Sequence, residues 1–413
     1  MPAPNPGEAL APSAAVIVFL AFALAYFLSA LVRAITATLS PTLSVELSLN
    51  ASDLGLLAGG YFFGFALTQL PLGNWLDRHG PRKVILAFLM VAVLGCVAFA
   101  MASSFTGLLA ARVLTGMGVS ACLMAPLTGY RRWFTPAVQL RANSWMLMTG
   151  SFGMLASTLP VQWLVPVAGW RPLFWGLAAL IAVSMAVIAW TVPRWDSAPV
   201  PAEATPKGYA QVWRHPYFRR MVPVGFFTYG GMIAMQTLWA GPWMVRVSGY
   251  APLEAAAGLF VINISMLCTF WSWGMVTPWL TRKGLTTERL IARGLPLSFF
   301  VLAAIIIAGP AAGAWSWALF CVSCTFVSLA QPAVGMVFPP ALAGRALSAY
   351  NLVIFAGVFV IQWGIGLLVD LFQAWGQDDI GAFRGAFAVF LATSVLSYAY
   401  FLWAPGHNRR HSP

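Results

Sequence analysis

The sequence Gly73-Asn-Trp-Leu-Asp-Arg-His-Gly-Pro-Arg-Lys83 separates two long apolar runs. It contains one acid, three fixed positive charges, a His and two glycines, in a chain in which only 8% of the residues are charged. A short charged segment between two apolar runs is typical of a tight loop at a membrane surface, where one helix leaves the bilayer and the next enters it. Residues 73–83 therefore predict a pair of membrane-spanning helices on either side.

The composition fits an integral membrane protein. The chain is 60% hydrophobic and 8% charged, whereas soluble domains have roughly 25% charged residues. Its apolar stretches of about 20 residues fit helices that cross a hydrocarbon core of about 30 Å, and the alternating pattern of an outer-membrane barrel is missing. We interpret the net charge of +12 as cytoplasmic loops enriched in Lys and Arg, and we expect no nucleic acid partner.

Twelve apolar stretches predict an all-α integral membrane fold with twelve transmembrane helices. Of the 23 Lys and Arg residues, 18 fall on one side of these spans, two lie within spans and three fall on the other side. The positive-inside rule then places both termini in the cytoplasm, and we expect a multi-pass protein of the bacterial inner membrane. The expected spans are 14–36, 53–76, 84–103, 106–129, 142–166, 172–192, 221–245, 255–279, 291–309, 314–337, 347–371 and 384–404.

An internal repeat predicts two pseudo-symmetric halves of six helices each. We expect a first half at 1–192, a cytoplasmic linker at 193–220 that is rich in proline, and a second half at 221–413. In such duplicated folds, a site near the membrane midplane alternates between the two faces. Two blocks recur with one offset of 204 residues: Phe134-x-Pro-Ala-x-x-x-Arg141-Ala-x-Ser144 as Phe338 to Ser348, and Trp75-Leu-x-Arg78-x-Gly80 as Trp279 to Gly284.

These features resemble the major facilitator superfamily. Residues 73–83 are similar to its signature between helices 2 and 3, G-x-L-x-D-R-x-G-R-[KR], with Trp75 at the Leu position, and Arg112-x-x-x-Gly116-x-Gly118 resembles its second motif. The resemblance implies a secondary transporter that works by alternating access, with Asp77 facing the N-terminal end of the helix that contains Arg345. The gating residues it implies are Gly73, Asp77, Arg78, Gly80, Arg82, Lys83, Arg141, Arg282, Gly284 and Arg345.

Arg33 is the principal candidate for substrate binding, and the alternative is that it reaches the lipid headgroups from the outer end of its helix. Charge within a membrane span is costly and marks a functional site by default, and only Arg33 and Arg112 lie more than two residues inside the predicted spans. The pattern Arg33-x7-Pro41 resembles the first helix of organophosphate:phosphate antiporters and anion:cation symporters, in which the matching Arg binds the anionic group of the substrate. Thr237 stands where the phosphate antiporters have a second Arg, which favours a singly charged, carboxylate-like metabolite. Arg112 is expected either to brace two helices or to contact this substrate.

Further candidates come from spans one, four, seven and ten, which line the central path in the superfamily. Each is also a residue type that packs or hydrogen bonds between membrane helices. Gly230-Gly231 and Gly241-Pro242 are expected to let span seven bend. The additional substrate-binding candidates are Tyr26, Ser29, Tyr229, Gln236, Trp239 and Gln331.

Three alternatives to an organic anion carrier stay open. An efflux carrier for a neutral or drug-like solute would be expected to show a glycine-rich pattern in residues 150–160, which is missing. A non-transporting membrane sensor of the same fold has no distinguishing sequence feature. A Cu(I) carrier would use sulfur ligands, here Met232, Met235, Met266, Cys268, Cys321 and Cys324.

The expected partners are a small-molecule substrate and membrane lipids, and the protein is expected to be a monomer without a cofactor or a resident metal. We expect no enzyme activity, because the short polar loops hold no pair of nucleophile and base. The predicted spans contain no Asp, Glu or His away from their ends. This absence predicts uniport or anion exchange, because an ordinary proton carrier is missing.

Overall fold

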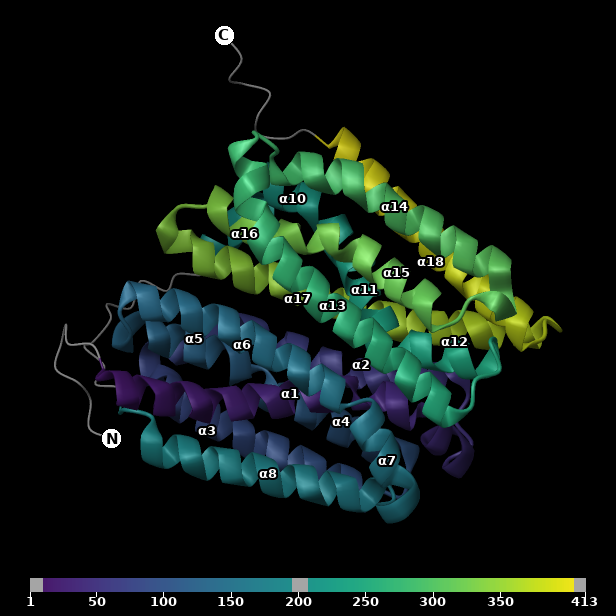
Figure 1. Cartoon of the computed structure of the whole chain (residues 1–413), viewed down its shortest axis with the longest axis horizontal. Coiled ribbons are helices and arrows are strands. Elements are labelled where there is room, and N and C mark those ends of the chain that lie inside the picture. The colour runs from purple at the N-terminus through teal and green to yellow at the C-terminus, as the bar shows by residue number, and fades with distance from the viewer. Residues whose placement is uncertain (1–9, 195–206, 405–413) are drawn as a thin grey trace, which may run out of the picture. The chain divides into compact units, whose positions relative to one another are not determined.

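The computed structural model describes residues 10–194 and 207–404, and every regular element in those ranges is a helix (Figure 1). The chain divides into two compact units, which are described separately below. The first unit contains Met1–Ile35 and Phe63–Ala204, and the second contains Thr36–Phe62 and Thr205–Pro413. The second part of α1 and the first part of α2 therefore group with the C-terminal residues, while the division at the linker stays a prediction.

Eight helices precede the linker. Most of the first unit is built from α3 to α8, whereas α1 and α2 contribute to both units. Their bounds are α1 Pro12–Glu46, α2 Ala51–Leu67, α3 Gln69–Met101, α4 Phe105–Val119, α5 Ala121–Trp133, α6 Pro136–Ala156, α7 Leu159–Ala168 and α8 Trp170–Thr191.

The elements after the linker include two π-helical segments, η1 and η2, and two short 3-10 segments, η3 and η4. Their bounds are α9 Lys207–Arg214, α10 Pro216–Pro223, η1 Val224–Tyr229, α11 Gly230–Ala234, η2 Met235–Trp239, α12 Ala240–Arg246, α13 Pro252–Arg282, α14 Thr287–Ala308, η3 Gly309–Ala311, α15 Ala314–Cys324, η4 Thr325–Leu329, α16 Ala330–Val337, α17 Pro340–Ala374 and α18 Asp379–Trp403.

Each of the twelve predicted spans coincides with helical structure. In the described ranges, nine helices are long and apolar enough to cross a membrane, and the bent pair of α6 and α7 makes up to ten. The other two predicted spans are interrupted: span two continues from α2 into α3 past Thr68, and span seven contains η1 and η2. The all-α membrane fold is confirmed, and it accommodates twelve spans.

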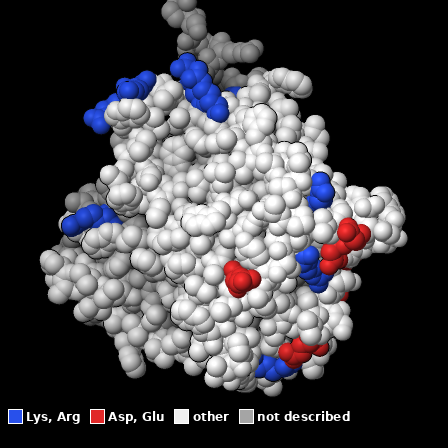
Figure 2. All heavy atoms as spheres, turned by 45° about the vertical axis from the view of Figure 1, so that its right-hand side comes forward, with Lys and Arg blue, Asp and Glu red and all other residues white. Residues whose placement is uncertain are grey.

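The surface is dominated by uncharged side chains. Figure 2 shows a face on which charged residues occur only as small isolated groups. Large apolar side chains are exposed on several helices, including Trp190 on α8, Phe300 on α14 and Trp315 on α15. Such an extended apolar exterior suits contact with lipid tails and not with water.

The two blocks of the internal repeat adopt the same local backbone. Gly80 has a φ of 74° and Gly284 a φ of 73°, a left-handed conformation that glycine adopts without a steric penalty. In the other block, Phe134 and Phe338 are both extended residues that end one helix, and the next helix begins at Pro136 or Pro340. Equal offsets in the sequence thus correspond to equal turns in the structure.

Close contacts between backbones hold the first unit together. A Cβ at Gly118 of α4 would collide with the backbone of Ala92 on α3, and one at Gly95 of α3 would collide with Thr115 on α4. Small residues at such positions let membrane helices approach closely. On its other side, α3 runs along α8 (Figure 1), where the rings of Phe99 and Phe174 stack with centroids 4.1 Å apart.

Candidate functional site

Three of the predicted substrate-binding residues share one face of α1. Tyr26, Ser29 and Arg33 are spaced three and four residues apart, which places them in a row along a helix. Tyr26 and Ser29 are buried, whereas Arg33 is half-buried. Of these three residues, only Arg33 therefore has a partly accessible polar group.

Groups from two other helices surround Arg33 in the first unit. Its guanidinium carbon lies 5.8 Å from the ring centroid of Phe65 on α2, within the range of a cation–π interaction. The thiol of Cys122 on α5 lies near Ser29 and within the electrostatic reach of Arg33. A fixed cation beside a hydroxyl, a thiol and an aromatic ring provides both the charge and the apolar wall that a small organic anion needs.

Arg112 occupies a different environment from Arg33. It is 1% exposed, and its Nη1 donates a hydrogen bond to the backbone oxygen of Val32 at 3.0 Å. Val32 directly precedes Arg33, so Arg112 ties α4 to the turn of α1 that carries the candidate anchor. This geometry favours the bracing interpretation of Arg112 over direct contact with substrate.

Tyr26 contributes to helix packing. Its ring lies directly against Gly150 of α6, where a Cβ would collide with it. Gly153, one turn further along α6, approaches the backbone oxygen of Phe27 equally closely. These two glycines seat α6 against α1, which fixes the face on which Ser29 and Arg33 lie.

In the second unit, the two π-helical segments lie in predicted span seven. The N–H of Gly230 bonds to the oxygen of Gly225, and the N–H of Ala240 bonds to the oxygen of Met235, both five residues back. The sequence predicts bends near Gly230-Gly231 and Gly241-Pro242. The segment η1 ends directly before the first pair, and η2 ends two residues before Gly241. Such segments redirect side chains and are frequent at functional sites.

The second π segment carries a buried hydrogen-bonded network. Gln236 Nε2 donates to Asn263 Oδ1 at 2.9 Å, and Trp239 Nε1 donates to the backbone oxygen of Gln362 at 3.1 Å. The side-chain nitrogen of Gln362 donates to Thr237 Oγ1 at 3.0 Å. Gln362 is fully buried, and its Oε1 has no hydrogen-bond partner among the described residues. Buried polar groups without partners are uncommon, so this oxygen is available to accept a hydrogen bond.

The remaining two candidates, Tyr229 and Gln331, lie in predicted spans seven and ten. Tyr229, at the end of η1, is half-buried. Gln331 on α16 is also half-buried, and its Nε2 donates to Asn351 Oδ1 on α17 at 2.6 Å. Both residues therefore combine partial access with a polar group, although Gln331 already has a protein partner.

Several residues near these candidates were missed by the sequence analysis, which considered only spans one, four, seven and ten. The amide side chains inside the apolar spans eight and eleven could have been identified from the sequence, because an amide in a membrane span needs a polar partner there. An aromatic ring and a thiol in apolar spans carry no such signal. The missed residues are Phe65, Cys122, Asn263, Asn351 and Gln362.

The predicted gating residues lie mainly at exposed positions. Arg82 is half-buried and donates a hydrogen bond to the backbone oxygen of Ala189 on α8, so it ties the charged loop to the end of another helix. Gly73 has open space where a side chain would lie. Arg345 is half-buried, and the exposed gating residues are Asp77, Arg78, Lys83, Arg141 and Arg282. The gating role of all these residues stays a prediction.

The Cu(I) alternative stays a prediction, because it depends mainly on methionine sulfurs. Within residues 10–194 and 207–404, no three His, Cys, Asp or Glu side chains are grouped as metal ligands would be. Cys321 and Cys324 are both buried, and the sulfur of Cys324 lies 3.8 Å from the backbone oxygen of Thr228.

Known bacterial proteins resemble this chain over about half to most of its length. The inner membrane transport protein YajR of Escherichia coli is 25% identical over 360 residues, which cover 84% of this chain and 76% of YajR. SauU of Cupriavidus necator, described as a probable sulfoacetate transporter, is 27% identical over 49% of this chain and 50% of its own. Both relatives are bacterial, which supports an inner-membrane location for this multi-pass protein.

The fold is also found among solved structures. A bacterial homologue of the human lysosomal transporter Spinster, in an inward-facing and unoccupied conformation, matches with a TM-score of 0.75. The match covers 96% of this chain and 98% of that one at 17% identity, which is evidence for the fold alone. The model of the Major Facilitator Superfamily matches residues 22–360. This chain therefore belongs to the Major Facilitator Superfamily of membrane transporters.

Proposed function

We propose that this protein is a secondary transporter that moves a small organic anion, a carboxylate-like metabolite, by alternating access. The observation that carries the proposal is the environment of Arg33. A half-buried guanidinium within an apolar helix lies beside the ring of Phe65 and close to Ser29 and Cys122. A charge at such a depth is costly and is usually retained for binding or conduction.

The proposal favours one negative charge on the substrate. Arg112 is buried and bonded to Val32, so of these two arginines Arg33 is the partly exposed one. A guanidinium binds a carboxylate through two parallel hydrogen bonds, which suits a single carboxylate group. The description of SauU as a probable sulfoacetate transporter gives an organic anion as a precedent among the relatives. The loop at residues 73–83 is proposed as the cytoplasmic gate.

A ligand screen tests this function. Purified protein is heated in detergent with singly charged carboxylates, sulfonates, phosphate esters, neutral solutes and lipophilic cations. We expect a carboxylate to raise the Tm in a saturable way, because a ligand at 100 times its Kd stabilises the native state by about 2.7 kcal/mol. Arg33→Leu is the control, and it should lose this stabilisation. Stabilisation by neutral solutes or cations alone would contradict the proposal and favour the efflux carrier.

The coupling mode gives a second test. We propose uniport or anion exchange, because the predicted spans have no acid or His away from their ends. Uptake into proteoliposomes of a carboxylate that does not titrate in the assay range should proceed down its own gradient without an imposed pH gradient. Counterflow of labelled substrate distinguishes a carrier from a sensor, since only a carrier exchanges it. Strict dependence of uptake on the pH gradient would contradict this mode.

A further inference from the structure

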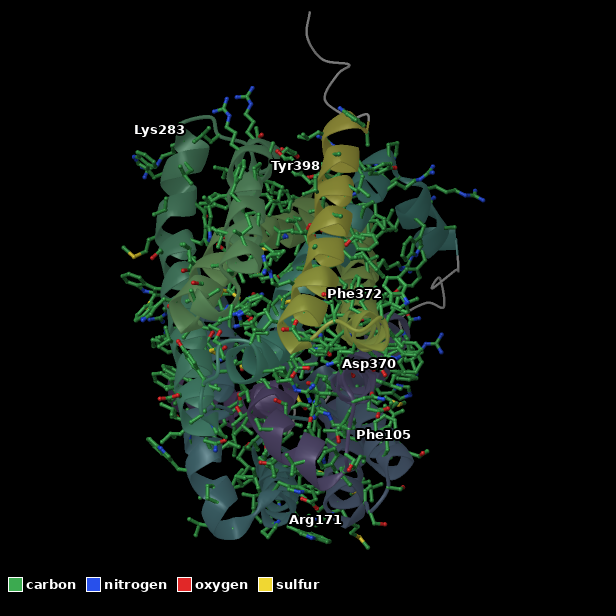
Figure 3. All side chains as sticks on the ribbon, turned by 90° about the vertical axis from the view of Figure 1, so that its right-hand side faces the viewer. Phe105, Arg171, Lys283, Asp370, Phe372 and Tyr398 are labelled. Carbon is green, nitrogen blue, oxygen red and sulfur yellow. The ribbon has the colours of Figure 1, made fainter. Side chains whose placement is uncertain are left out.

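Asp370 of α17 completes the N-terminus of a helix that lies more than 300 residues away in the sequence. Its Oδ1 accepts a hydrogen bond from the N–H of Ala51 at 3.0 Å, and its Oδ2 accepts one from the N–H of Ser52 at 2.9 Å. Ala51 and Ser52 are the first two residues of α2, and all three residues belong to the second compact unit. Asp370 is half-buried in the C-terminal turns of α17, close to Phe372 in sequence (Figure 3).

This contact has a clear electrostatic basis. The first N–H groups of a helix have no partner within the helix, and they lie at its positive end. A carboxylate that uses both oxygens on them makes two charge-assisted hydrogen bonds. The preceding residue, Asn50, caps α2 only in part, because its side-chain oxygen accepts from the N–H of Asp53 at 2.7 Å. The start of α2 is therefore satisfied jointly by its own Asn50 and by the distant Asp370.

Glycines let the same two helices pack backbone to backbone. A Cβ at Gly366 of α17 would collide with the oxygen of Ala51, and one at Gly55 of α2 would collide with the oxygen of Gln362. A further turn along α2, Gly59 faces the ring of Phe359. The contact ends at Phe62, whose ring stacks on that of Phe355 with centroids 6.1 Å apart. The seam thus runs for about three turns of α2 and about four turns of α17.

We propose that Asp370 and this glycine seam form a lock that holds α2 against α17, and that each transport cycle must break it. The positive-inside rule assigns this end of both helices to the outer face.

The lock is connected to the π segment of span seven. Gly55 packs against the backbone oxygen of Gln362, and the same oxygen accepts the hydrogen bond from Trp239 Nε1. A Cβ at Gly241, two residues after Trp239, would lie 3.1 Å from the oxygen of Ala37 on α1. Movement of α2 away from α17 therefore alters the surroundings of η2. The inference goes beyond the proposed function, because it does not depend on which substrate is carried.

A labelling experiment tests the lock without any substrate. Phe62→Cys is placed in full-length protein whose five native cysteines are replaced, and a membrane-impermeant maleimide is added to right-side-out vesicles. Asp370→Asn is expected to raise the labelling rate about tenfold, since a hydrogen bond to a charged group contributes roughly that factor. Asp378→Asn is the matched control. Asp378 caps only its own helix, where its Oδ1 accepts from the N–H of Gly381 at 2.8 Å.

A second pair of variants tests the seam. Gly366→Leu should also accelerate labelling, whereas Gly364→Leu should not, because Gly364 on the same helix has open space where its side chain would lie. Asp370→Glu, which keeps the charge, should label more slowly than Asp370→Asn. Fast labelling of Gly366→Leu with an unchanged rate for Asp370→Asn would overturn the role of Asp370. Unchanged rates in both would overturn the lock, whatever the ligand screen shows.

Discussion

Arg33→Ala is expected to abolish uptake of the organic anion into proteoliposomes while the protein still folds. Each charge-assisted hydrogen bond that the guanidinium makes to a carboxylate contributes about 1.5–3 kcal/mol, so loss of a bidentate pair lowers kcat/KM by about 100-fold or more. The fold should survive, because Arg33 is half-buried and the neighbouring turn of α1 is held by Arg112 through Val32. Initial uptake rates and the Tm are measured for the same preparation.

Three further variants sharpen this result. Arg33→Lys keeps the charge but loses the planar fork, so we expect an intermediate loss of about tenfold. Ser29→Ala removes the neighbouring hydroxyl and should have a smaller effect on uptake. Arg171→Ala is the matched control for the loss of one positive charge, because Arg171 stacks on Trp170 and bonds to the backbone of Ala102 outside the candidate site. Unchanged uptake in Arg33→Ala would refute its role as the anion anchor.

The features that could be predicted from sequence are those encoded locally or by repetition. The apolar runs determine the helices, since a membrane leaves few other ways to satisfy the backbone. The 204-residue offset indicated a duplication, and Gly80 and Gly284 at this offset both have a positive φ. Arg33 could be singled out because a charge in an apolar helix is conspicuous on its own.

The features that could not be predicted depend on contacts between distant segments. Phe65 and Cys122 are ordinary residues of apolar helices, and only the packing of α2 and α5 brings them near Arg33. The π segments of span seven leave no periodic signature in an apolar sequence. The hydrogen bonds of Asp370 to Ala51 and Ser52 could not be predicted, because nothing in the sequence around Ala51 and Ser52 indicates a distant carboxylate as their partner.

Gly118→Leu is expected to lower the thermal stability of the protein strongly. A Cβ at this position would collide with the backbone nitrogen and Cα of Ala92, and a backbone cannot rotate away as a side chain can. Overpacking of this kind costs about 3 kcal/mol, and the neighbouring contact of Gly95 with Thr115 leaves α3 and α4 no room to slide. The measurement is the Tm of the purified variant in detergent.

Gly176→Leu on α8 is the matched control, because nothing lies within 4 Å of a Cβ at this position. We expect its Tm to stay close to that of the unaltered protein, and equal values for both variants would contradict the packing argument. Gly118 and Arg112 both lie on α4. Gly118 lets α4 pack closely against α3, and Arg112 hydrogen bonds to Val32 of α1. Both therefore hold α4 in place, so transport defects of Arg112 variants should follow their loss of stability, whereas those of Arg33 variants should not.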